Sequence, residues 1–132
     1  MVSLKQVLSQ SVSSDSDLLW LARSIGVRVD QIDFKQYMDR EADYAILNMG
    51  TPQLGGTHWI AVSNKDKLYF DPLGLPPPRL IPTDYSYRAL DIQNPKYGRC
   101  GQYCVLWLWY VQHDKVDDFY RMFLHYDNLA SS

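Results

Sequence analysis

The segment Cys100–Gln112 places the strongest constraint on how this chain can fold. Residues Val105–Val111 are apolar without interruption, so neither a helical nor a strand period can be read from them. The length of the whole segment favours a helix. A helix that is apolar on all sides must lie at the centre of a domain, with other elements packed around it. We therefore expect a central helix over residues 100–112.

The segments before and after it predict further helices and a group of short strands. Leu18, Leu21, Ala22 and Ile25 recur at helical spacing, with Asp15 or Ser16 as the cap and Gly26 as the stop. Residues 31–40 show only a weak pattern, which fits a short helix or an extended turn. The other expected elements are strands at 44–48, 57–63, 67–70 and 85–92, with a hairpin over 57–70, and a helix at 116–126. This order predicts the α+β class, with a small antiparallel sheet packed on the central helix.

Length and composition predict one folded domain. The chain has 132 residues, of which 46% are hydrophobic and 21% are charged, which excludes a disordered chain. Serines cluster before the first helix, and we expect residues 1–14 to form a flexible arm. The expected domain then covers 15–127, followed by a frayed tail at 128–132.

The charge balance and the cysteine content indicate which partners and which cellular compartment to expect. Thirteen basic and fifteen acidic residues leave a net charge of −2, so we expect no nucleic-acid partner. No apolar run approaches the roughly 20 residues that a bilayer span needs, so we expect no membrane partner. Residues 1–16 show no secretory signal, and two cysteines do not suggest a disulfide framework. We therefore expect an intracellular, reducing compartment.

Four residues at separate places in the sequence form a set that suits thiol chemistry. Cys100 stands at the start of the apolar helix, where the positive end of the helix dipole favours a thiolate. His58 on a strand can accept the thiol proton, and Asp71 at the end of the adjacent strand can accept the His58 Nδ1–H. Gln93 precedes Cys100 across a turn, and its amide together with the Cys100 N–H would make an oxyanion hole.

Each of these residues also has an ordinary structural explanation. A cysteine before an apolar helix is more often a core residue, and a histidine on a strand is usually a satisfied structural group. An Asp-Pro pair after a strand is a common turn signal. Residue chemistry alone therefore leaves catalysis and core packing both open.

Other kinds of site fit the sequence less well. Residues 50–57 have the glycine spacing of a phosphate-binding loop, but Gly56 occupies the position of the required lysine. Cys100 and Cys104 would need His113 and His125 to hold zinc, and these histidines lie too far apart in sequence. No Gly-x-Ser-x-Gly motif of a serine hydrolase is present. We expect neither a metal nor a cofactor.

Three stretches of the sequence carry a resemblance to a known family. They are Gly56-Thr57-His58-Trp59, Tyr69-Phe70-Asp71-Pro72-Leu73-Gly74, and the segment from Gln93 through Cys100-Gly101 to Cys104. In this order they resemble the adenovirus maturation protease (adenain) family, which shares a clan with the ubiquitin-like-protein-specific proteases. The resemblance covers about residues 42–111.

The resemblance implies a papain-like cysteine peptidase in which the central helix carries the nucleophile Cys100. It implies that His58 is the general base, that Asp71 orients His58 and that Gln93 is the oxyanion donor. Trp59 would form a wall of the substrate cleft. Asp71 stands where adenovirus enzymes have glutamate. No cysteine between Asp71 and Gln93 could anchor a disulfide-linked peptide activator.

The implied function is that of a thiol endopeptidase that cleaves polypeptides near glycine. The closest likeness is to short viral and virophage-type members, which implies processing of viral capsid or other structural precursors during virion maturation, in the host cell and in the virion. Three alternatives stay open: a deubiquitinase- or deSUMOylase-like peptidase, an acyltransferase that uses the same triad, and a non-enzymatic capsid-associated binding module. Cys104, one helical turn from Cys100, is expected to be a small buried hydrophobe. The alternative is a regulatory disulfide between the two cysteines.

Overall fold

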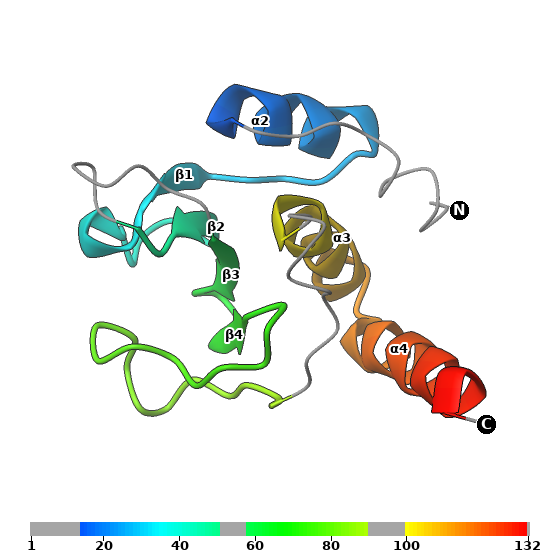
Figure 1. Ribbon diagram of the computed structural model, residues 1–132. Helices are drawn as coiled ribbons and strands as arrows, with labels where there is room; N and C mark the ends of the chain where they lie inside the picture. Colours follow the sequence, from blue (N-terminus) through cyan, green and yellow to red (C-terminus); the bar gives the residue numbers. More distant parts are fainter. Residues whose placement is uncertain (1–13, 51–57, 90–99, 132) are drawn as a thin grey trace.

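The computed structural model describes residues 14–50, 58–89 and 100–131, with side chains as far as Phe123. Figure 1 shows the arrangement of the elements. In chain order these are helix α2 (Asp15–Ser24), strand β1 (Gln31–Phe34), the 3-10 helix η1 (Lys35–Tyr37), strands β2 (Tyr44–Asn48), β3 (Trp59–Ser63) and β4 (Leu68–Phe70), and helices α3 (Cys100–Gln112) and α4 (Val116–Ser131). One sheet with helices packed against it confirms the α+β class.

The sheet is mixed, which corrects the expected antiparallel sheet. Its strand order in the described chain is β1-β2-β3-β4. β2, β3 and β4 pair antiparallel, whereas β1 runs parallel to β2, with Ile32 opposite Ile46. β1 lies within the segment expected to be a helix or turn. Its four residues alternate polar and apolar side chains, but they run directly into η1, so the strand pattern is too short to recognise.

The expected strand over 85–92 is also wrong within the described residues. Only Ser86 pairs with the sheet, through a parallel bridge to Leu68. The Ser86 N–H donates to the Lys67 carbonyl at 2.9 Å, and the Ser86 carbonyl accepts from the Tyr69 N–H at 2.9 Å. β4 is only three residues long, so it offers a short edge for pairing beyond Leu68. Residues 90–92 lie outside the described residues.

The helix ends differ slightly from those expected. Ser14, not Asp15 or Ser16, caps α2, because its Oγ accepts the Asp17 N–H at 3.2 Å. Gly26 follows α2 with a φ of +74°, as expected of a helix stop. α4 continues through residues 128–131, where we expected a frayed tail, because no glycine or proline interrupts the sequence after Val116.

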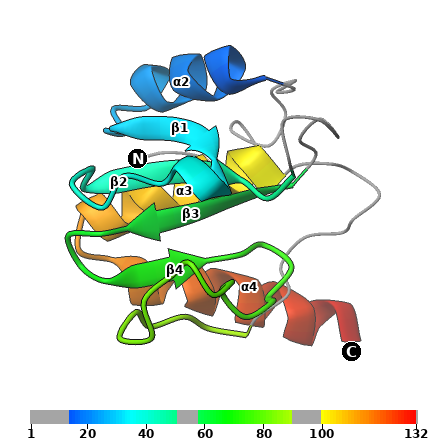
Figure 2. The same ribbon diagram turned by 90° about the vertical axis from the view of Figure 1, so that its left-hand side faces the viewer.

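Two apolar layers lie on opposite faces of the sheet. On one face, Ile46, Ala61 and Phe70 pack with the apolar sides of α2, α3 and α4. On the other face, the alternate strand residues pack with Ile81 and with partly buried side chains from the connecting segments. Figure 2 shows α3 behind the middle of the sheet, with α2 on its β1 side and α4 on its β4 side. α3 contacts β2, β3, α2 and α4, which confirms the expected central helix.

An aromatic cluster fixes β4 against the helices. The Phe70 ring stacks on Trp107 at a centroid distance of 5.3 Å and meets the edge of Phe119, also at 5.3 Å. The Trp107 Nε1–H donates to the Tyr120 hydroxyl at 3.1 Å, so the buried indole keeps its hydrogen bond. Because Phe70 is the last residue of β4, this packing determines where residue 71 leaves the sheet.

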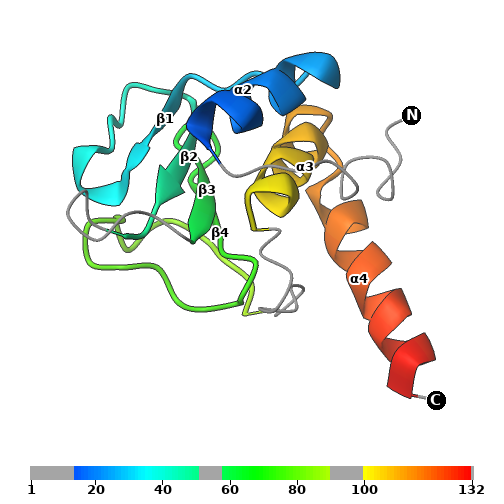
Figure 3. The same ribbon diagram turned by 45° about the horizontal axis from the view of Figure 1, so that its top comes forward.

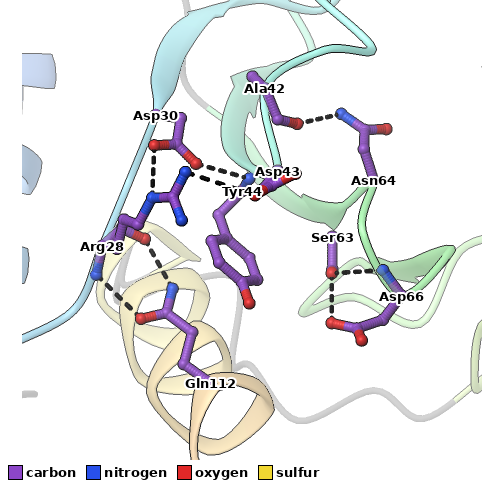
Figure 4. Close-up of polar contacts among 9 residues, drawn as sticks. All are labelled: Arg28, Asp30, Ala42, Asp43, Tyr44, Ser63, Asn64, Asp66 and Gln112. Atoms are coloured by element: carbon purple, nitrogen blue, oxygen red, sulfur yellow. Dashed lines mark hydrogen bonds and ion pairs between the residues drawn. The ribbon is translucent and has the colours of Figure 1, made fainter.

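The far end of α3 is held by hydrogen bonds to the segment between α2 and β1. The Gln112 side chain accepts the Arg28 N–H at 2.9 Å and donates to the Arg28 carbonyl at 2.6 Å. Figure 4 shows this pair beside the contact of the Arg28 guanidinium with Asp30, whose second carboxylate oxygen accepts the Tyr44 N–H. The C-terminal end of α3 is therefore bonded to the segment that leads into β1, while its N-terminal end lies beside the start of β3.

Candidate active site

His58 and Asp71 meet at one end of the sheet. His58 directly precedes β3, and Asp71 directly follows β4. Because β3 and β4 are antiparallel, the start of one and the end of the other lie side by side, as Figure 2 shows. The His58 Nε2 lies 2.8 Å from the Asp71 Oδ1. The structure therefore brings together the two residues that the hairpin pattern placed at one end.

The ring nitrogen that contacts Asp71 differs from the one expected. The sequence analysis assigned Nδ1 to the carboxylate, but the contact is through Nε2. Nδ1 is therefore the ring nitrogen that does not contact the Asp71 Oδ1.

The Asp71 carboxylate is held in a buried turn. Its side chain is 2% exposed, and Oδ1 accepts the Leu73 N–H at 2.8 Å in addition to the contact with His58. The Gly74 N–H donates to the Asp71 carbonyl at 2.8 Å, and Gly74 has a φ of +73°, which favours glycine at this turn. A buried charge is costly unless it is paired and hydrogen-bonded, and both conditions are met here.

Cys100 is the first residue of α3, next to the start of β3. The Trp59 backbone N–H donates to the Cys100 Sγ at 3.3 Å. The sulfur therefore lies at the N-terminal end of α3, where the helix dipole is positive. Sequence reasoning missed the Trp59 N–H contact, since a backbone donor leaves no mark on residue type.

Gly101 lets α2 pack against the first turn of α3. A Cβ at position 101 would lie 2.6 Å from the Leu18 Cδ2, closer than two carbon atoms can approach. Leu18 is fully buried, so it has little room to move. The glycine after the cysteine therefore has a packing role.

The imidazole is more accessible than the sulfur. The His58 side chain is 21% exposed, whereas Cys100 is 3% exposed. In this conformation solvent reaches the site mainly at the His58 ring.

Electrostatics favour a protonated His58. Burial by itself would lower the pKa of His58, but hydrogen bonds to Asp71 and Cys100, and attraction to both groups, outweigh this and raise the pKa to about 9. At neutral pH the ring therefore carries a proton. A protonated imidazole next to a sulfur atom stabilises the thiolate, which is the nucleophilic form.

Cys104 lies one turn further along α3 and is 0% exposed. Burial raises the pKa of its thiol well above the ordinary value. A buried thiol with a raised pKa is a poor nucleophile, as expected for a small apolar core residue. Within the described residues, no disulfide joins Cys100 to Cys104.

Two predicted site residues remain, Trp59 and Gln93, and only Trp59 is among the described residues. The Trp59 side chain is partly buried and lines a cavity next to the site. Gln93, the expected oxyanion donor, lies outside the described residues. Among the described side chains, no group of three His, Cys, Asp or Glu is placed to hold a metal ion, and no described helix is long and apolar enough to cross a bilayer.

Comparison of this chain with protein families, with curated proteins and with solved structures finds no match.

Proposed function

We propose that this protein is a cysteine endopeptidase with Cys100 as nucleophile, His58 as general base and Asp71 as the residue that orients His58. The observation that carries this proposal is the convergence of the three groups from distant parts of the chain. The His58 Nε2 lies 2.8 Å from the Asp71 Oδ1, and the backbone N–H of the next residue, Trp59, lies 3.3 Å from the Cys100 Sγ, so the three groups come together at one end of β3. Packing alone does not explain why a buried carboxylate and an imidazole lie beside a cysteine in the core.

The proposed reaction follows the usual course of thiol proteases. In the resting enzyme His58 already holds the proton that Cys100 has given up, in keeping with its raised pKa. The thiolate attacks the scissile carbonyl carbon to form a tetrahedral oxyanion. His58 then gives the proton to the leaving amine, and an acyl-enzyme remains on sulfur. A water molecule that His58 deprotonates attacks the thioester, which releases the carboxylate product and restores the thiol.

We also propose that Gln93 and the Cys100 backbone N–H stabilise the oxyanion, as the sequence pattern implies. Removing one oxyanion donor commonly lowers the chemical step by roughly 10²-fold. Gln93→Ala should therefore lower kcat by about that factor while the protein still folds. An unchanged kcat in the Gln93→Ala variant would remove this residue from the mechanism.

The proposed fold type is papain-like, of the adenain kind. It is supported by the position of Cys100 at the start of a central helix that packs on the strands flanked by His58 and Asp71. The proposed substrates are polypeptides cut near glycine, with viral capsid or structural precursors as the natural class. This last step is supported by the resemblance of the sequence motifs, including His58-Trp59 and Cys100-Gly101.

An activity probe tests the proposal directly. A peptide that ends in glycine and carries a thiol-reactive group should label Cys100 in the folded wild-type protein, and labelling should fall sharply in His58→Ala. Cys104→Ala is the matched control, since it removes the other thiol and should label normally. Labelling of Cys100 at equal rates in wild type and His58→Ala would contradict the proposed base. No labelling of the folded protein would favour a binding module.

A further inference from the structure

A cavity of about 300 Å³ lies next to the candidate active site. Its described walls come from the ends of β1 and β2, the start of β3 and the start of α2. Figures 2 and 3 show the start of α2 at the same end of the sheet as the start of α3. Trp59 connects the cavity to the nucleophile, because Trp59 lines the cavity and its N–H contacts the Cys100 Sγ. His58 and Cys100 are not among the described lining residues, so the cavity suits a side chain near the scissile bond and not the bond itself.

One row of residues across three strands forms a wall of this cavity. The register pairs Phe34 with Asn48 and Asn48 with Trp59, so these three side chains lie in a row on the same face of the sheet. Ile46 and Ala61, two residues away on β2 and β3, pack with the helices, so this is the face that the helices cover. The carboxamide of Asn48 therefore lies between two aromatic residues in a wall that faces the helices.

The Asn48 carboxamide is buried, and only part of its hydrogen-bonding capacity is used. Asn48 is 4% exposed, and its Oδ1 accepts the Gly50 N–H at 2.8 Å, which fixes the orientation of the amide. Among the described residues, no group accepts a hydrogen bond from the Asn48 Nδ2. A carboxamide carries two N–H donors, and its oxygen can accept two hydrogen bonds. Both donors and one acceptor position therefore remain for a ligand, and a ligand that pairs with a buried polar group gains affinity.

The described walls of the cavity favour a neutral ligand over an anion. The described lining residues include no lysine or arginine that could pair with a carboxylate. The start of α2 does not replace them, because the Asp15 Oδ1 accepts the Ser16 N–H at 3.1 Å and the Ser14 Oγ accepts the Asp17 N–H at 3.2 Å. These two helix donors are therefore already occupied.

We propose that this cavity binds a glutamine side chain of the peptide substrate, at a position close to the scissile bond, and that Asn48 selects it. The two carboxamides are complementary, because the glutamine oxygen accepts from the Asn48 Nδ2 and the glutamine N–H donates to Oδ1. The two methylene groups of glutamine pack on the apolar part of the wall, which is formed by Ile32, Phe34 and Trp59.

The same contacts exclude the closest analogues of glutamine. An aliphatic side chain leaves the Asn48 amide unpaired, and a site built around a buried polar group discriminates strongly against such a ligand. A glutamate side chain has no N–H for Oδ1 and would bring a charge without a counter-ion. The inference rests on the proposed peptidase function and adds a specificity that the family resemblance does not supply. Asn48 is then a specificity residue that takes no part in the bond-breaking step.

Direct peptide binding tests the proposal without requiring catalysis. The full chain with Cys100→Ala is titrated with fluorescent hexapeptides that contain a central Gly-Gly, with glutamine moved through the other four positions in an alanine and serine background. Matched peptides carry norleucine, which has an aliphatic stem without the amide, or glutamate, which has nearly the same shape with a charge. At one position glutamine should bind roughly tenfold more tightly than either, as expected for two hydrogen bonds at a shielded site. The ratio of glutamine to norleucine should be the same in 1 M salt, since neither side chain is charged.

Variants of Asn48 decide whether this residue is responsible. Asn48→Leu keeps a similar shape but removes the amide, so norleucine should bind at least as tightly as glutamine. Asn48→Asp can still accept the Gly50 N–H but loses the donors, so the preference should change from glutamine to lysine. Gln112→Leu is the matched control, since it removes an amide at the far end of α3 and should leave the preference unchanged. A nuclear magnetic resonance titration needs no variant of Asn48: in isotope-labelled Cys100→Ala protein, the side-chain NH₂ signals of Asn48 should shift on addition of the glutamine peptide.

The outcomes that contradict the inference are specific. Equal binding of glutamine and norleucine at every position would mean that water alone satisfies Asn48, and it overturns the inference. No binding of either peptide, unmoved Asn48 signals, or an unchanged preference in a folded Asn48 variant overturns it as well. Absence of Cys100 labelling in the probe experiment instead overturns the proposed function, so the two failures are distinguishable.

Discussion

The pair formed by His58 and Asp71 predicts a specific dependence of stability on pH. The pKa of His58 rises from 6.5 to about 9 in the folded protein, because its hydrogen bonds and charge attraction to Asp71 and Cys100 exceed the cost of burial. At about 1.4 kcal/mol per pKa unit, this corresponds to stabilisation on the order of 3 kcal/mol. The folded state binds the His58 proton more tightly than the unfolded state does. The contribution is therefore fully present below pH 6.5 and is lost as the pH rises through about 9.

Urea unfolding from pH 6 to pH 9.5 under reducing conditions measures this effect. The free energy of unfolding of the wild-type protein should fall by about 3 kcal/mol over this range relative to His58→Gln, in which the titrating group is absent. Asp71 keeps the Leu73 N–H in that variant, so the carboxylate is not left without a hydrogen bond. The comparison uses the difference in pH slope and not the absolute stability, because His58→Gln is expected to be less stable at every pH.

Asp71→Asn is the second variant in this series. It removes the negative partner while the amide can still accept the Leu73 N–H, so the pKa of His58 should fall towards its ordinary value and most of the slope should disappear. Parallel pH profiles for wild type and His58→Gln would show that His58 is not held protonated in the folded state. The proposed imidazolium would then lose its electrostatic basis.

Three further substitutions test the packing around the site. Gly101→Ala should destabilise the protein by about 1–2 kcal/mol, because the new Cβ meets Leu18. In a double-mutant cycle with Leu18→Ala the two costs should not add, and additive costs would contradict this packing. Gln112→Ala should lower the free energy of unfolding in urea by about 1–2 kcal/mol, because two hydrogen bonds to Arg28 are lost. The labelling rate of Cys100 should stay unchanged, and an altered rate would show that the two ends of α3 are coupled. Cys104→Ala should lower the free energy of unfolding by about 1 kcal/mol, because it leaves a small cavity, and should leave labelling of Cys100 intact. A loss of labelling equal to that of Cys100→Ala would mean that the nucleophile is misassigned.

The local hydrophobic pattern predicted the helices and strands in which that pattern is clear. It missed a strand that forms only because another strand pairs with it. The apolar segment over 100–112 and the hairpin over 57–70 were recognisable because burial on all sides and strand alternation leave clear patterns. β1 was missed because four residues carry too little pattern, and its parallel pairing with β2 is a long-range contact that no local signal encodes. The segment around Ser86 shows the reverse, since its composition suits a strand but only one residue finds a partner.

The same division holds for the candidate site. By itself, the sequence determined which chemical groups are available and, through the hairpin spacing, that His58 and Asp71 share one end of the sheet. Only the tertiary structure decided that Nε2 contacts the carboxylate and that the Trp59 N–H reaches the Cys100 sulfur. Ring orientation, backbone donors and cavities arise from how whole elements pack, and packing depends on residues far apart in the chain.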